Sequence, residues 1–121
     1  MNDRETTVNQ LKDLVAGFIR EREWERYHSP KNLSMSIAIE AAEIMEMFQW
    51  LDLATAKEKV DSDPAFRQHL CEELADVTAY VLSLCQQNGI DLAAALEDKM
   101  VKNRKKYPVD QVRGLDYEKP A

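Results

Sequence analysis

The sequence is poor in the residues that interrupt helices, with three glycines and four prolines among 121 residues. Combined with a hydrophobic content of 45%, this scarcity argues against a disordered chain and favours a helical globular protein. No internal repeat or low-complexity tract indicates a second domain. We therefore expect one all-α domain over residues 1–121, with a core over about residues 8–108 and a loose C-terminal tail.

Positive charge is not in excess either. The formal net charge is −6, so the phosphate backbone of a nucleic acid polymer is not an expected partner. No apolar run approaches the ~20 residues that a membrane-spanning helix requires. The N-terminal segment MNDRETTVNQLKD lacks the basic start and the apolar core of a signal peptide. We therefore expect a soluble, cytoplasmic protein with no membrane partner.

Cysteine is scarce as well, and Cys71 and Cys85 are the two present. Both lie in one predicted helix, whose rise per residue would separate them by about 21 Å, too far for a disulfide. Two cysteines without metal-ligand spacing fit the reducing environment of the cytoplasm.

What the sequence has in abundance is hydrophobic residues at helical spacing. Ser29, Asp63 and Asp91 each stand where a helix cap is expected, the first two directly before a proline. The pattern predicts helices over about residues 8–26, 30–51, 64–88 and 92–106, with a short helix beginning near Thr55. A chain of this size buries a modest core, so we expect an apolar face shared with a second copy in a homo-oligomer.

Two acidic clusters interrupt the apolar pattern of the second and third long helices. Their members are Glu40, Glu43 and Glu46 in IEAAEIMEMFQW, and Glu72, Glu73 and Asp76 in CEELADVTAYV. Carboxylates three residues apart share a helix face, so each helix can aim oxygens at a point between the helices. Such oxygens suit Mg²⁺, which also binds substrate phosphate. The clusters predict a metal site, with solvated helix faces as the alternative.

Aromatic side chains near these clusters suggest a pocket for a base. Tyr80 follows Asp76 on the same helix face. Trp24 and Trp50 are the two tryptophans, and His28 lies close after the first of them. Base stacking on such rings is favourable and tolerant of sequence, although core-rim aromatics are an equally good explanation.

The last predicted helix offers groups for phosphate. Lys99, Asn103 and Tyr107 follow an i, i+4, i+8 row, and Arg104 stands among further basic residues beside it. Basic residues at a helix C-terminus also favour the helix dipole without any ligand.

Taken together, carboxylates for Mg²⁺, cations for phosphate and rings for a base predict a nucleoside triphosphate site with hydrolysis at phosphorus. A carboxylate beside the metal would accept the proton of the attacking water. Glu43 or Glu46 could be that base, and the spacing does not separate a base from a ligand.

The motifs EAAEIMEMFQW, EELADVTAYV and KMVKNRKKYP occur in this order, and together they resemble the all-α MazG-like nucleoside triphosphate pyrophosphohydrolases, whose hallmark is ExxE on one helix and ExxD on the next. EREWERYHSPKNL looks most like the dCTP pyrophosphatase branch of that family. The resemblance implies a four-helix-bundle-like fold, dimers that often pair into tetramers with sites at the subunit interface, and hydrolysis between the α and β phosphates.

The resemblance also implies roles for individual residues. Mg²⁺, with Mn²⁺ as a substitute, would be held by Glu40, Glu43, Glu73 and Asp76. The nucleoside would be bound by Trp24, His28, Trp50 and Tyr80, and the phosphates by Lys99, Asn103, Arg104 and Tyr107. One departure concerns the base: close dCTP-hydrolysing relatives carry a His in the first helix where this chain has Val15.

Two other classes of protein are alternatives to this interpretation. A di-iron carboxylate bundle needs Glu-x-x-His twice, and the sequence contains it once, at Glu25 and His28, because the residue three before His69 is Phe66. A non-enzymatic helical interaction module is the second alternative, and it predicts no dependence on Mg²⁺.

Overall fold

The computed structural model describes residues 1–114, which form helices and no strand. The chain divides into two compact units, the first over Met1–Gly89 and the second from Ile90 onward. The helices of the first unit are α1 (Val8–Glu21), a 3-10 helix (Glu25–Tyr27), α2 (Pro30–Phe48), α3 (Leu53–Ser62) and α4 (Pro64–Gln87). The second unit contains α5 (Leu92–Lys106) and α6 (Val109–Val112). The predicted all-α architecture is confirmed, and whether the two units act as the single expected domain stays a prediction.

Side-chain caps begin most of these helices, and those at Ser29, Asp63 and Asp91 are the ones that the sequence predicts. The hydroxyls of Thr7 and Ser29 accept hydrogen bonds from the backbone N–H groups three residues later, at 3.1 and 3.2 Å. The carboxylates of Asp63 and Asp91 do the same at 3.1 and 2.9 Å. Each cap satisfies a backbone donor that the first turn of a helix leaves without a partner.

Three helix boundaries differ from the prediction. α1 ends at Glu21 rather than near Arg26, because the chain turns at Glu23, which has a φ of 53°. α2 ends at Phe48 rather than Leu51. α3 begins earlier than Thr55, because Asp52 is its cap and accepts the Thr55 N–H at 2.7 Å.

The C-terminal tail also contains more structure than expected. A short helix, α6, follows Pro108, whose fixed φ of −60° suits a helix start. The rest of the predicted loose tail, residues 115–121, lies outside the described residues.

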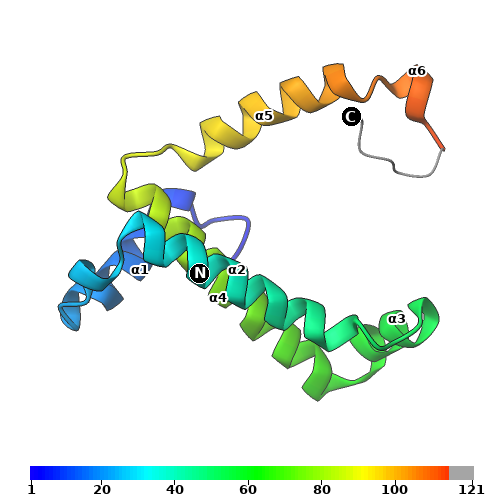
Figure 1. Ribbon diagram of the computed structural model, residues 1–121, viewed down its shortest axis with the longest axis horizontal. Helices are drawn as coiled ribbons and strands as arrows, with labels where there is room; N and C mark the ends of the chain where they lie inside the picture. The colour runs from blue at the N-terminus through cyan, green and yellow to red at the C-terminus, as the bar shows by residue number, and fades with distance from the viewer. Residues whose placement is uncertain (115–121) are drawn as a thin grey trace. The chain divides into compact units, whose positions relative to one another are not determined.

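Helix α4 is the centre of the first unit and packs against α1, α2 and α3. α2 and α4 lie side by side and run in opposite directions, joined through α3 (Figure 1). The buried core is small, with Ile19 of α1, Leu33 of α2, and Leu82, Ser83 and Cys85 of α4. This antiparallel pair brings the two acidic clusters of the sequence onto facing helices.

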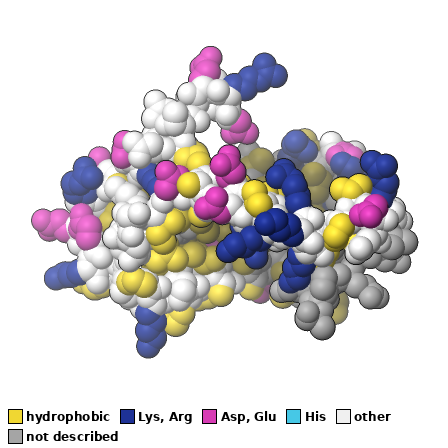
Figure 2. Space-filling model, turned by 90° about the horizontal axis from the view of Figure 1, so that it is seen from above, with side chains coloured by type: hydrophobic (Ala, Val, Ile, Leu, Met, Phe, Trp, Pro, Cys, Tyr) yellow, Lys and Arg dark blue, Asp and Glu magenta, His cyan; other side chains and the backbone are white. Residues whose placement is uncertain are grey.

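Much apolar surface stays exposed on the single chain. Large hydrophobic side chains that are about half exposed or more include Leu14, Met35, Ile39, Met45 and Leu74, and Figure 2 shows hydrophobic side chains (yellow) open to the surface among charged ones. Exposed apolar surface of this kind often marks an interaction face. None of the helices in residues 1–114 is long and apolar enough to cross a membrane.

Candidate metal centre and adjoining pocket

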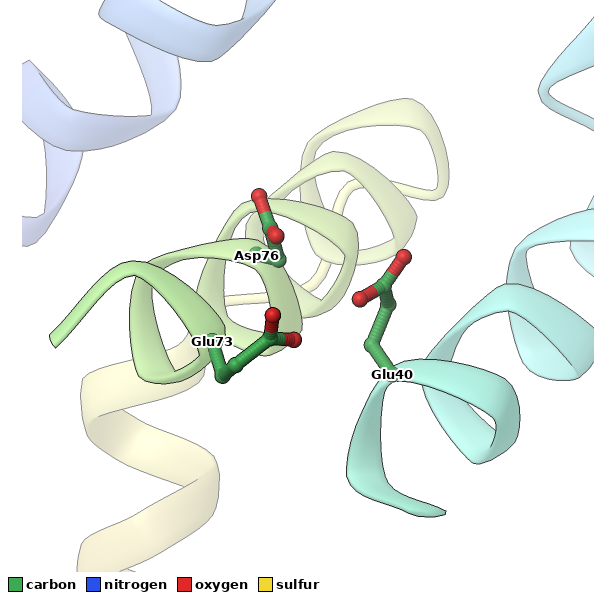
Figure 3. A group of neighbouring side chains, drawn as sticks. All are labelled: Glu40, Glu73 and Asp76. Atoms are coloured by element: carbon green, nitrogen blue, oxygen red, sulfur yellow. The ribbon is translucent and has the colours of Figure 1, made fainter. Parts of the chain in front are cut away.

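Three of the predicted metal ligands converge between α2 and α4. Glu40 projects from α2, and Glu73 and Asp76 project from successive turns of α4 toward it (Figure 3). One carboxylate oxygen from each residue lies within 4.8 Å of the others. The i, i+3 spacing on α4 and the packing of α2 against it produce this arrangement.

The carboxylates of this group are incompletely satisfied by the protein. The Oε2 atoms of Glu40 and Glu73 are buried and have no hydrogen-bond partner among the described residues. The Glu73 side chain is only 12% exposed. Burying an ionised oxygen without a partner is unfavourable, and a hard divalent cation would satisfy it. The residues present therefore fit a hard divalent cation.

The electrostatics of the group agree with this assignment. Burial raises the pKa of Glu40 from 4.5 to about 7, and the neighbouring carboxyls of Glu43, Asp76 and Glu73 add to the effect. The pKa of Glu73 is raised too, mainly by burial and then by Glu43. Clustered carboxyls whose pKa values are raised by burial and by one another are expected of a cation site.

The raised pKa of Glu40 predicts how the metal-free protein responds to pH. Between about pH 4.5, the ordinary pKa, and about pH 7, the pKa in the folded protein, the folded state binds more protons than the unfolded state. The free energy of unfolding should therefore fall as the pH rises through this window. Thermal melting in EDTA across pH 4.5–8 would measure the fall, and Mn²⁺ at pH 7.5 should reverse it.

A Glu40→Gln variant is the control for this prediction, since it cannot titrate at this position. Its melting temperature should depend less on pH than that of the wild type. If the melting temperatures of the wild type and the variant depend on pH in the same way in EDTA, the assignment of the raised pKa to Glu40 is contradicted.

Glu43, the fourth predicted ligand, lies next to the group without belonging to it. Its carboxyl is close enough to Glu40 and Glu73 to raise the pKa of both. It also lines a small cavity of about 270 Å³ with Glu46, Met47, His69 and Glu73. The two candidate bases therefore lie side by side, one against the carboxylate group and one a turn further along α2.

A second cavity, of about 320 Å³, adjoins the carboxylate group. Its lining residues are Val15, Phe18, Ile19, Trp24, His28, Asp76, Ala79, Tyr80 and Ser83. The Phe18 and Trp24 rings meet edge to face at 6.0 Å, and the His28 and Tyr80 rings are 6.4 Å apart. The structure thus brings together three of the four residues predicted to bind a nucleoside, Trp24, His28 and Tyr80.

The other predicted substrate-binding residues lie elsewhere. Trp50 follows the end of α2, is 87% exposed and is not among the residues that line the aromatic cavity. Its predicted role in binding the nucleoside stays a prediction. Lys99, Asn103 and Arg104 lie on α5, and Tyr107 caps its C-terminus. All four belong to the second unit, and their predicted contact with phosphate stays a prediction.

Sequence reasoning missed several residues of the two cavities. Ala79 and Ser83 share a face of α4 with Asp76 and Tyr80, since they lie three and seven residues after Asp76. His69 lies four residues before Glu73, the spacing at which helical side chains meet. These spacings could have identified all three.

The fold and the site together define a class of protein. It is an all-α protein in which carboxylates from two antiparallel helices lie beside an aromatic pocket. The chain belongs to the MazG-like family, whose sequence model matches residues 35–119. The family and the fold expected from the motifs are thereby confirmed.

Curated relatives and a solved structure extend this likeness. The chain is 38% identical over 110 residues to dCTP pyrophosphatase 1 from Rattus norvegicus, a match covering 91% of this chain and 64% of the relative. It is 35% identical over 116 residues to dCTP pyrophosphatase 1 from Homo sapiens, covering 90% of this chain and 64% of the relative. The chain therefore spans less than two thirds of the length of these relatives.

The crystal structure of a pyrophosphatase from Archaeoglobus fulgidus is similar to this chain. It superposes with a TM-score of 0.78 at 37% identity, and the match covers 89% of this chain and 98% of that one.

Proposed function

We propose that this protein hydrolyses a nucleoside triphosphate between the α and β phosphates, releasing a nucleoside monophosphate and pyrophosphate. One observation carries the proposal: Asp76 belongs both to the carboxylate group and to the aromatic cavity. The candidate metal ligands therefore adjoin the candidate base pocket, as a nucleotide with a metal-bound phosphate chain requires. The names of the relatives, dCTP pyrophosphatase 1 and pyrophosphatase, support the same reaction.

The carboxylates of Glu40, Glu73 and Asp76, with Glu43 beside them, would hold Mg²⁺, and Mn²⁺ could replace it. A bound divalent cation supplies neutralisation of the charge that develops on phosphate during hydrolysis. The buried, unpartnered oxygens of Glu40 and Glu73 are the support for this assignment.

The protein's own side chains would perform the remaining steps. Trp24, His28 and Tyr80 would hold the base in the aromatic cavity. Glu43 or Glu46 would accept the proton of the water whose oxygen bonds to the α phosphorus. The bond from that phosphorus to the bridging oxygen then breaks, and pyrophosphate leaves with the bonding electrons. Lys99, Asn103, Arg104 and Tyr107 would bind the phosphate chain.

We further propose dCTP, or a dCTP modified on its base, as the substrate, in control or cleansing of the nucleotide pool. The relatives named for dCTP support this choice. Val15 lines the cavity together with Phe18, Ile19 and Ala79, so one wall of the base pocket is apolar. Such a wall discriminates weakly between bases that differ by a single apolar group.

A homo-oligomer, either a dimer or a pair of dimers, is also part of the proposal. The exposed hydrophobic side chains of α1, α2 and α4 support it, because a small buried core gains stability from a second copy.

End-point product analysis tests the reaction. Purified protein would be incubated with each deoxynucleoside triphosphate and with 5-methyl-dCTP, in Mg²⁺ or in EDTA. We expect monophosphate and pyrophosphate in Mg²⁺ and not in EDTA. The carboxylates and the phosphate chain are both negatively charged, so they can lie close together only with a cation between them. A preference of tenfold or more for the modified base, about 1.4 kcal/mol, would favour cleansing over simple pool control. Diphosphate and phosphate as products, or no hydrolysis, would refute the proposal, and the latter outcome would favour a binding module.

A further inference from the structure

His69 lies outside the carboxylate group but contacts one of its members. Its Nε2 atom is 3.2 Å from Oε1 of Glu73, four residues later on α4. The His69 side chain is 55% exposed and the Glu73 side chain only 12%. The ring therefore approaches the buried carboxylate from the solvent side of the helix. An ionised carboxylate only accepts hydrogen bonds, so the ring donates from Nε2.

The two oxygens of Glu73 consequently have different surroundings. Oε1 is bound by the histidine ring, whereas Oε2 is buried without a hydrogen-bond partner among the described residues. A hydrogen bond to one oxygen restricts rotation of the whole carboxylate. It therefore fixes the orientation of the carboxylate, one oxygen of which lies within 4.8 Å of oxygens of Glu40 and Asp76.

We propose that His69 is a positioning residue, which orients the Glu73 carboxylate for the metal through the Nε2–Oε1 hydrogen bond. The inference rests on the proposed function only in taking the carboxylate group as a metal centre. Groups that hydrogen-bond to a metal ligand fix its orientation, and their loss typically lowers metal affinity about 10- to 100-fold. His69 is a neighbour of the ligands and is not itself a ligand of the metal.

A surface interaction that merely stabilises the helix is the competing explanation, and α4 contains a matched example. Gln68 Nε2 donates to Glu72 Oε1 at 3.3 Å, with the same spacing one position earlier. Glu72 is exposed and is not part of the carboxylate group. The two pairs share a helix and a spacing and have similar lengths, 3.2 and 3.3 Å, and they differ in whether the acceptor belongs to the carboxylate group.

The experiment measures Mn²⁺ affinity of the metal-free protein by calorimetry, without nucleotide, for wild type, H69A, H69Q and Q68A. We expect H69A to weaken the affinity about tenfold. H69Q should stay within about threefold of wild type, because the glutamine amide can donate from a similar position. Q68A should match wild type. All four should melt alike in EDTA, since both altered side chains are largely exposed.

An H69A affinity within twofold of wild type would overturn the proposal. An H69Q affinity as weak as that of H69A would also overturn it, because the hydrogen bond would then not be the cause. A wild type that binds no Mn²⁺ would leave nothing to position and would overturn it as well. A wild type that binds Mn²⁺ but hydrolyses no nucleotide would refute the proposed function alone, and the affinities of the variants would still decide the role of His69.

Discussion

Replacing Glu73 by glutamine should abolish turnover while the protein stays folded. The amide has nearly the shape of the carboxylate, so packing between α2 and α4 is kept, but the negative charge that would bind the cation is lost. A catalytic cation contributes several kcal/mol to the stabilisation of the transition state, so kcat/KM for dCTP in Mg²⁺ should fall about 10³-fold. Steady-state kinetics with circular dichroism on the same samples would measure both effects.

The melting temperature in EDTA provides an independent part of this prediction. Burial and the adjacent Glu43 raise the pKa of Glu73, which means that its charge is unfavourable in the folded metal-free protein. A neutral side chain at this position should leave the melting temperature of that protein unchanged or higher. Loss of activity without loss of stability is typical of a residue kept for a site rather than for packing.

Glu72→Gln is the matched control, since the two glutamates are adjacent on α4. Glu72 is exposed and bonded to Gln68, away from the carboxylate group. Its replacement should leave kcat/KM within about twofold. Equal losses in the two variants, or a Glu73→Gln enzyme within tenfold of wild type, would refute the assignment of Glu73 to the metal.

The helices of this protein could be predicted because their signals are local. The Ser29-Pro30 and Asp63-Pro64 pairs each combine a capping oxygen with a proline that fits the first turn. The early end of α1 could not be predicted in this way. It depends on a positive φ at Glu23, a conformation that glutamate rarely adopts and that no residue type in the segment announces.

The presence of a carboxylate group could also be predicted from local spacing. Which glutamates of α2 belong to it could not. The spacing of Glu73 and Asp76 fixes them on one face of α4 whatever surrounds the helix. Which glutamate of α2 meets them depends on how α2 is rotated and shifted against α4, a property of packing between helices. Glu40 therefore joins the group, while Glu43 lies beside it, and the sequence did not separate the two.

The aromatic residues show the same limit more strongly. Trp24 and Trp50 look alike in the sequence, each near a predicted helix end. The turn at Glu23 places Trp24 against Phe18 in the cavity, whereas Trp50 stays exposed after α2. Local patterns identify such residues as candidates, and only the path of the chain decides which of them share a pocket.

Replacing Trp24 by alanine should weaken the use of nucleotide substrates without stopping the chemistry. Stacking of a base on an aromatic side chain contributes ~1–3 kcal/mol, so kcat/KM for dCTP should fall about 10- to 100-fold. The stacked base is held equally before and during the reaction, so the loss should appear as a higher KM with a nearly unchanged kcat. Trp24→Phe keeps a ring at the cavity and should recover part of the loss.

Tyr27→Ala is the control for a general effect of removing an aromatic ring from this segment. Tyr27 lies three residues after Trp24, is 55% exposed, has its ring beside the Arg26 guanidinium and does not line the cavity. Its replacement should change KM by less than about twofold. A Trp24→Ala variant with a lower kcat and an unchanged KM would contradict a role in binding the base. It would instead indicate that the ring supports the adjoining carboxylate group, since Asp76 lies in the lining of the same cavity.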